Sequence, residues 1–314
     1  MGTFIGHISP GLAFLSFGIF FAFRFSWMVL NGERIQYAER RKPKMQLGFR
    51  SFLCTLPVDG VLKVIYGTLA VMAEFFYPPG VNKFYFYLRE DADFQFRNPN
   101  EWQHVTMYGY FAFSGWVDIV SQTCLPRRLV LLEHVGITVA FYITTLLLKF
   151  HMHGKEEVEN RVHTLLLLTC FLTSLILTAE IWKPNYRQLW FSKTCLVMIQ
   201  GTWLLHAAFI LYRPPTGKRW DSTNMANLMF LTNFYCWHVA VNALLLAAIF
   251  GLTTLLYRLH LRSKRHGDLL KGKYLLGWNG VKERYDELQK LTRNGEEEEE
   301  EEEAQEKRLQ EEVL

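Results

Sequence analysis

The chain has 314 residues, of which 50% are apolar, 15% are aromatic and only 20% are charged. Its apolar residues occur in long runs, which is typical of a membrane protein and argues against one or two ordinary soluble domains. The net charge of +4 is small and follows from lysines and arginines on one side of the membrane, so no nucleic-acid partner is needed to explain it.

Seven of the apolar runs are long enough to cross a bilayer as helices, which takes about 20 residues each. They lie at roughly residues 8–30, 51–77, 104–125, 129–150, 162–182, 189–213 and 228–257. The alternating segments of a membrane β-barrel do not occur. We therefore predict an all-α polytopic membrane protein, with a seven-transmembrane-helix bundle over residues 1–257 and the lipid bilayer as its main partner.

Prolines and glycines indicate where these helices begin and end. The first helix is expected to begin after Ser9-Pro10-Gly11, and it carries Arg24 in its second half. The second should begin near Pro57 and end just past Glu74. Because proline cannot continue a helix, further helix ends are expected at Pro78, Pro126, Pro184 and Pro214.

The tail over residues 258–314 differs in kind from the bundle. Residues 258–273 are basic with interspersed leucines and should lie against anionic lipid headgroups. Residues 281–291 predict one short amphipathic helix, and the eight consecutive glutamates of Glu296–Glu303 should stay solvated. We expect a largely disordered tail that offers a contact for protein partners.

The distribution of lysine and arginine predicts the orientation, because these residues favour the cytosolic loops. The loops after the first, third and fifth spans, with the start of the tail, hold 16 of them, against eight on the opposite face. The N-terminus should therefore lie in the lumen or outside the cell, and the C-terminus in the cytosol.

Histidines gather in the non-cytosolic half of the predicted membrane region. Seven of the ten lie there, together with Glu74: His7, His104, His151, His153, His163, His206 and His238. From the rise of a helix, we expect His206 about 10 Å and His238 about 15 Å below the end of its helix. Ionisable groups at such depth are costly, so they indicate a functional site.

Metal binding is one explanation of this cluster, because neutral imidazole is the commonest metal ligand and Zn²⁺ takes three or four such donors. His151-x-His153 followed by His163 loosely matches the spacing of zinc sites, with the other four histidines as further candidate ligands. Glu74 is then a ligand or the general base for a metal-bound water. Three alternatives stay open: solvated histidines at the membrane interface, proton chemistry, and haem ligation by His104 and His163.

A second polar layer is expected in the cytosolic half of the helices. Its members are Arg24, Asp59, Lys63, Asp118, Glu133, His134, Glu180 and Lys193. Their mixed signs predict ion pairs between helices, with Arg24 or Lys63 as the partner of Asp118. Asp118 lies about 21 Å along its helix from His104, so it should not join the histidine site. A coupled proton path is the alternative to purely structural pairs.

An ordered set of short motifs extends over residues 1–260 and resembles the transmembrane protein 45 family, on the branch of the transmembrane epididymal proteins. These motifs are Gly6-His7, Ala73-Glu74-Phe75-Phe76, Trp102-Gln103-His104, His151-Met152-His153-Gly154, Val162-His163, Gln200-Gly201-Thr202-Trp203, Pro214-Pro215 and Cys236-Trp237-His238. The resemblance implies seven helices and residence in Golgi, endosomal or plasma membranes. It implies no established biochemical activity and supplies no catalytic residues.

Two departures from the family pattern affect the proposed site. His206 stands where the family has glutamine, and a family glutamate in the fourth helix is replaced near Thr144. If that glutamate belongs to a metal site, activity here is in doubt, unless His206 rearranges the site.

Three classes of function are compatible with the sequence. The first is a non-enzymatic membrane protein that acts in trafficking or as a scaffold, with histidines that are structural or bind a metal structurally. The second is a zinc-dependent membrane hydrolase, and the third is a transporter or a haem-containing redox protein.

Overall fold

A computed structural model describes residues 3–33, 57–87 and 95–312, with few side chains beyond Lys264. The basic loop over 34–50, the predicted start of the second span at 51–56 and the segment 88–94 lie outside the described residues. Every regular element in the described ranges is helical, which confirms the all-α fold class.

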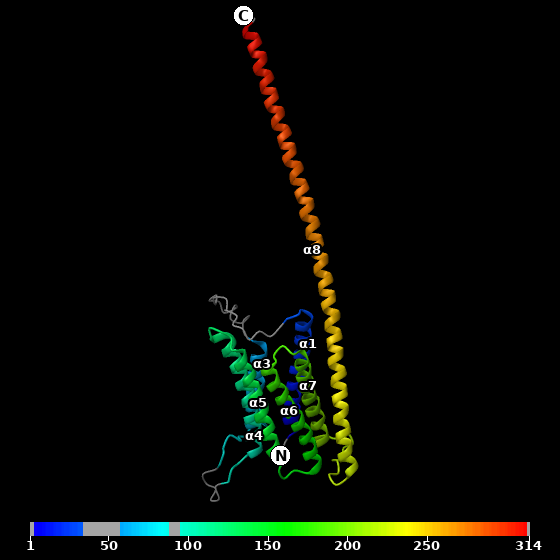
Figure 1. Ribbon diagram of the computed structural model, residues 1–314. Coiled ribbons are helices and arrows are strands. Elements are labelled where there is room, and N and C mark those ends of the chain that lie inside the picture. The colour runs from blue at the N-terminus through cyan, green and yellow to red at the C-terminus, as the bar shows by residue number, and fades with distance from the viewer. Residues whose placement is uncertain (1–2, 34–56, 88–94, 313–314) are drawn as a thin grey trace. The chain divides into compact units, whose positions relative to one another are not determined.

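Along residues 3–254 the elements stand side by side as a bundle (Figure 1). They are α1 (Phe4–Leu30), α3 (Val58–Phe76), α4 (Pro99–Ile119), the π-helix η1 (Val120–Cys124), α5 (Val130–His151), α6 (Glu157–Trp182), α7 (Arg187–Tyr212) and α8 (Met225–Glu312). Five of them are long and apolar enough to cross a membrane: α1, α5, α6, α7 and the Met225–Lys264 part of α8. Since α3 and α4 carry more polar residues and fall short of this measure, seven spans remain a prediction.

Helix α1 begins earlier than the sequence predicted. It starts at Phe4, and the expected start after residue 11 is wrong, because Pro10 lies inside the helix. Thr3 explains the difference: its side chain accepts a hydrogen bond from the backbone N–H of Gly6 at 3.0 Å and so caps the first turn. Proline is also tolerated near a helix start, where fewer internal hydrogen bonds are lost.

The tail also differs from expectation, because α8 continues without interruption to Glu312. It thus includes the glutamate run that we expected to stay outside any helix. Glutamate is a good helix former, and repulsion between like charges four residues apart costs only a few tenths of a kcal/mol per pair. The chain divides into two compact units at residues 254 and 255, three residues from the expected boundary.

Six helices pack in a cyclic order. Helix α1 packs on α7, α7 on α6, α6 on α5, α5 on α4 and α4 on α3, and a lighter contact between α3 and α1 completes the cycle. Glycine allows the closest approach: a Cβ atom on Gly201 of α7 would lie 2.8 Å from the Cα atom of Leu15 in α1. Gly60 and Gly115 bring α3 and α4 together in the same way.

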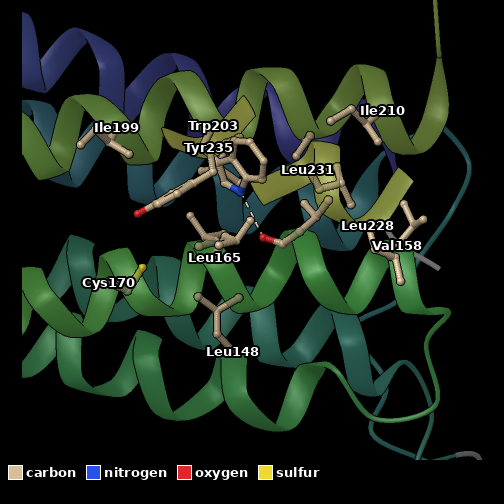
Figure 2. Close-up of a cluster of buried hydrophobic side chains, with 14 of the residues drawn as sticks. Leu148, Val158, Leu165, Cys170, Ile199, Trp203, Ile210, Leu228, Leu231 and Tyr235 are labelled. Carbon is tan, nitrogen blue, oxygen red and sulfur yellow. Dashed lines mark hydrogen bonds between the residues drawn. The ribbon is translucent and has the colours of Figure 1, made fainter. Parts of the chain in front are cut away.

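A hydrophobic core lies where α6, α7 and the first part of α8 meet (Figure 2). Trp203 of α7 is fully buried there, and its indole N–H donates to the carbonyl oxygen of Val162 at 3.0 Å. Tyr235 of α8 packs on Trp203, and its hydroxyl contacts that of Thr169 in α6 at 2.6 Å. This core fixes the three helices against one another beside the polar groups described next.

Candidate functional site: a histidine network at one end of the bundle

One carboxylate and four imidazoles, each from a different helix, form a continuous chain of contacts. Glu74 of α3 accepts a hydrogen bond from Nδ1 of His104 in α4 at 2.7 Å. The His104 ring lies 4.8 Å from that of His151 in α5. His151 lies 5.5 Å from His163 in α6, and His163 lies 5.6 Å from His7 in α1, between ring centroids. We call these five residues the histidine network.

Local structure explains why the rings meet. His7, His104 and His163 lie in the first two turns of their helices, and His151 is the last residue of α5. The short turn 152–156 reverses the chain and brings the ends of α5 and α6 together. His7, His151 and His163 are buried, with 6%, 4% and 3% of their surfaces exposed. The structure thus places five of the eight predicted site residues in contact with one another, at one end of the bundle.

Hydrogen bonds fix the protonation of two rings. Nδ1 of His7 lies 3.1 Å from the carbonyl oxygen of Thr3, and Nδ1 of His163 lies 2.8 Å from that of Glu159. A carbonyl oxygen can only accept, so Nδ1 carries the proton in both rings. Nε2 then holds the lone pair of a neutral imidazole and can accept one further proton.

His151 has contacts at both ring nitrogens. Nδ1 donates to the side-chain oxygen of Gln103 at 2.9 Å, and Nε2 accepts from the Lys155 ammonium at 3.1 Å. Lys155 also pairs with Glu159 at 2.5 Å. Sequence reasoning missed Gln103, Lys155 and Glu159. The i, i+4 spacing of Lys155 and Glu159 beside the histidines was the available signal.

This arrangement does not fit the predicted zinc site. Among the described residues, no three His, Cys, Asp or Glu side chains are placed to hold one metal ion. The lone pair of His151 is used by Lys155, whose positive charge also opposes a cation at this position. Haem ligation fits no better, because the ring of His151 lies against both His104 and His163, where a porphyrin would have to stand.

The other predicted ligands lie apart from the network. His153 is exposed, and its Nδ1 contacts the carbonyl oxygen of Phe150 at 3.1 Å. His206 of α7 and His238 of α8 form a separate pair, with Nδ1 of the first 2.8 Å from Nε2 of the second. Both rings pack edge-on against Trp203. The eight predicted site residues thus divide into the network, one histidine pair and one exposed side chain.

The histidine pair yields a first testable expectation. Replacing His238 with alanine leaves the half-buried ring of His206 without its partner, which should cost about 1–3 kcal/mol of stability. His238→Gln keeps a polar partner within reach and should recover part of the loss. Thermal unfolding in detergent measures the loss in His238→Ala and the recovery in His238→Gln. Equal melting temperatures for the wild type and His238→Ala would contradict the contact between His206 and His238.

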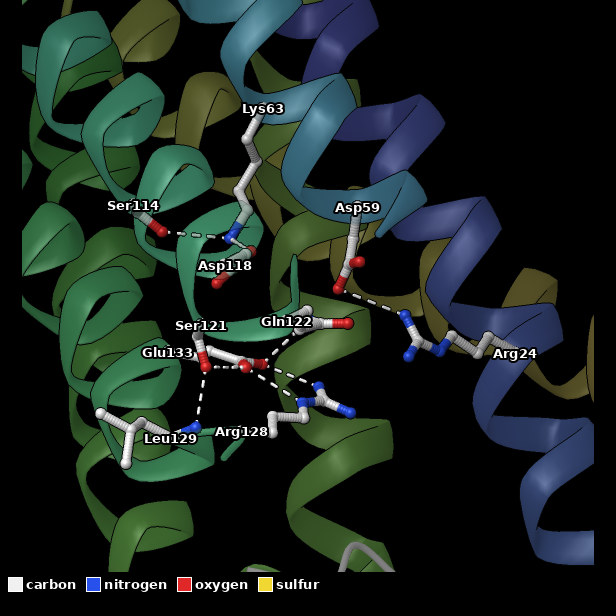
Figure 3. Close-up of polar contacts among 10 residues, drawn as sticks. All are labelled: Arg24, Asp59, Lys63, Ser114, Asp118, Ser121, Gln122, Arg128, Leu129 and Glu133. Carbon is white, nitrogen blue, oxygen red and sulfur yellow. Dashed lines mark hydrogen bonds and ion pairs between the residues drawn. The ribbon is translucent and has the colours of Figure 1, made fainter. Parts of the chain in front are cut away.

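The predicted second polar layer is also present, at the opposite ends of α1, α3, α4 and α5 (Figure 3). Lys63 pairs with Asp118 and donates to the Ser114 hydroxyl at 3.0 Å. Arg24 pairs with Asp59 at 3.2 Å. Between α6 and α7, Lys193 pairs with Glu180 at 2.6 Å. These contacts confirm that the mixed charges form ion pairs between helices.

Glu133 has more partners than the sequence predicted. Arg128 donates to both of its oxygens, at 3.0 and 2.7 Å, and the side chains of Ser121 and Gln122 in η1 donate to it as well (Figure 3). The hydrogen bonds to Glu133 raise the pKa of the Arg128 guanidinium, which therefore stays charged. The widened turn of η1 aims Ser121 and Gln122 at the same carboxylate, an arrangement that periodicity alone does not predict.

Comparisons with known proteins agree with a membrane protein whose activity is not established. Residues 131–251 match a family model described as a family of unknown function, DUF716. Transmembrane epididymal protein 1A of Mus musculus is 37% identical over 268 residues, 84% of this chain and 85% of its own. Transmembrane epididymal protein 1 of Rattus norvegicus is 38% identical, over 82% of this chain and 83% of its own. Transmembrane epididymal protein 1 of Homo sapiens is 37% identical, over 65% of this chain and 74% of its own.

Proposed function

Because the chain belongs to the family of the transmembrane epididymal proteins, an integral membrane family, we propose that it is a proton-responsive membrane protein whose histidine network binds protons when its compartment acidifies. One observation carries this proposal: four imidazoles and one carboxylate from five helices lie in one chain of contacts. Binding of protons there is coupled directly to the packing of those helices.

The charges around the network explain why protons would loosen it. Besides its four histidines, the network contains the Glu74 carboxylate, and the titratable groups that face it are Tyr108, Lys155, Glu159 and Tyr212. Lys155 is already a cation against His151, so each further proton places like charges side by side. The two carboxylates can offset part of this repulsion, but they cannot offset four charged imidazoles. The helix ends should therefore separate progressively as the pH falls below about 6.5, because histidines exposed by opening take up protons there more readily than the buried rings do.

This response suits the membranes that the family resemblance implies. We place the network in the lumen of Golgi or endosomal membranes, or outside the plasma membrane, with the C-terminal tail in the cytosol. The orientation is supported by the excess of lysine and arginine in the loops of the opposite face. Endosomal and late Golgi lumens are acidic, so the network would face a pH that favours opening of the helix ends and uptake of protons by the exposed histidines.

The competing functions have less support. A zinc-dependent hydrolase needs a set of ligands that the described residues do not form. A role in trafficking or as a scaffold through the tail stays a prediction, because side-chain contacts are described for few tail residues. Proton binding, in contrast, needs only the contacts that the histidine network already makes.

The test compares melting temperatures at about pH 7.5 and about pH 5.5 in detergent. Burial of the neutral network stabilises the fold at the higher pH, and the stabilisation is lost as the pH falls, because the unfolded histidines accept protons more readily. His163→Gln should reduce the pH-dependent drop by about 2–4 °C, which corresponds to roughly 1 kcal/mol in a protein of this size. His153→Gln is the matched control, since its exposed ring lies outside the network.

Two results would contradict the proposal. One is the same pH dependence in the wild type, His163→Gln and His153→Gln. The other is about one zinc ion per purified chain that is lost in His163→Gln and kept in His153→Gln. That pattern would favour the zinc-dependent hydrolase over proton binding.

A further inference from the structure

The interior face of α4 connects the two polar layers. His104, Phe111, Ser114 and Asp118 follow one another at spacings of seven, three and four residues, which places them on one face of the helix. Ser114 and Asp118 are buried. His104 at one end belongs to the histidine network, and Asp118 pairs with Lys63 some 21 Å away along the helix.

Three aromatic rings fill the interior between these layers. Phe111 of α4 lies 5.6 Å from Phe14 of α1 and 5.1 Å from Phe141 of α5, and Phe14 lies 6.2 Å from Phe141, all between ring centroids. Phe111 is seven residues from both His104 and Asp118, so it stands about 10 Å from each along the helix. We call Phe14, Phe111 and Phe141 the aromatic barrier.

The ion pair below the barrier is deeply enclosed. Side-chain exposure is 12% for Lys63 and 4% for Asp118. Gly60 and Gly115 bring α3 and α4 so close at this level that neighbouring backbone leaves no room for a Cβ atom on Gly115. Buried acid–base pairs of this kind mark proton relays in membrane proteins, since a carboxylate can take up and release a proton beside its cation.

We propose that the bundle carries protons between the two polar layers, with the aromatic barrier as its gate. This rests on the proposed function, because the histidine network is the entry. When the rings part and water enters, a proton leaves a charged imidazole of the network, which becomes neutral. It crosses along the water molecules and binds a carboxylate oxygen of Asp118. Asp118 then releases it to water on the far side and pairs again with Lys63.

The experiment measures proton flux into liposomes that contain the purified full-length chain and a pH-sensitive dye, with valinomycin and potassium to balance charge. Wild-type flux should rise as the pH on the histidine side falls from about 7.5 to about 5.5. Phe111→Ala removes part of the barrier and should raise flux at the higher pH about tenfold. Phe113→Ala is the matched control, because Phe113 lies on the same helix with 62% of its surface exposed.

The double variant Lys63→Met/Asp118→Asn tests the relay without leaving a lone buried charge. It should lower the acid-driven flux about tenfold. Flux no greater than in protein-free liposomes, in both the wild type and Phe111→Ala, would overturn the inference. So would equal gains in Phe111→Ala and Phe113→Ala, or unchanged flux in the double variant. Absence of flux in the wild type, with intact pH-dependent melting, would refute conduction and leave proton binding standing, whereas absence of the pH-dependent melting would refute both.

Discussion

Replacing Asp118 with alanine is expected to destabilise the protein by about 3–5 kcal/mol, because it leaves the Lys63 ammonium buried without its counter-charge. Ser114 still accepts from Lys63, but a neutral hydroxyl cannot replace a carboxylate. The measurement is the melting temperature in detergent, followed by the loss of monodisperse protein on size-exclusion chromatography after heating.

Two controls separate the buried charge from a general effect of mutation. Lys63→Met/Asp118→Leu removes both charges and should recover most of the stability, because an apolar pair of similar volume avoids the cost of burying ions. Asp59→Ala breaks the Arg24 pair, in which the arginine side chain is 40% exposed, and should cost no more than about 1 kcal/mol. Equal losses in Asp118→Ala and Asp59→Ala would show that the Lys63–Asp118 pair is not buried as described.

The second large effect is expected at Gly201, where α7 lies against α1. Any side chain here would press on the backbone of Leu15, which cannot move aside as a flexible side chain could. Gly201→Val should therefore force the two helices apart and cost about 3 kcal/mol or more. Thermal unfolding in detergent shows the loss directly, and a low yield of folded protein would have the same origin.

Gly109→Ala provides the matched comparison. Gly109 is also a helical glycine, but apart from the backbone of its own helix nothing lies within 4 Å of the position that its Cβ would take. Since alanine favours a helix over glycine by up to about 1 kcal/mol, this variant should match or exceed the wild type in stability. A melting temperature for Gly201→Val as high as that for Gly109→Ala would contradict the close contact of α1 and α7.

Part of the fold could be predicted from the sequence, because long apolar runs indicate membrane helices. The start of α1 could not, since it depends on one hydrogen bond from Gly6 to Thr3. The continuation of α8 through the glutamates differs from the prediction, because the helix propensity of glutamate outweighs the repulsion between neighbouring like charges. Neither feature changes which helices carry the histidines.

The sequence indicated which residues form the candidate site better than it indicated how those residues interact. The positions of His7, His104 and His163 near helix ends placed them at one end of the bundle before any contact was known. The contact of Lys155 with the lone pair of His151 depends on side-chain rotamers and on the conformation of the turn 152–156. Sequence spacing determines neither of these. The pairing of His206 with His238 depends likewise on how α7 and α8 are rotated.

The cyclic order of the helices has a mechanical consequence. Among the described helices, the junction of α1 with α3 is the weakest in the cycle, while glycines hold α3 and α4 together. The α3–α4 hairpin is therefore the part of the bundle that can separate from α1 with the least loss of packing, and the Arg24–Asp59 ion pair is one of the contacts that such a separation would break.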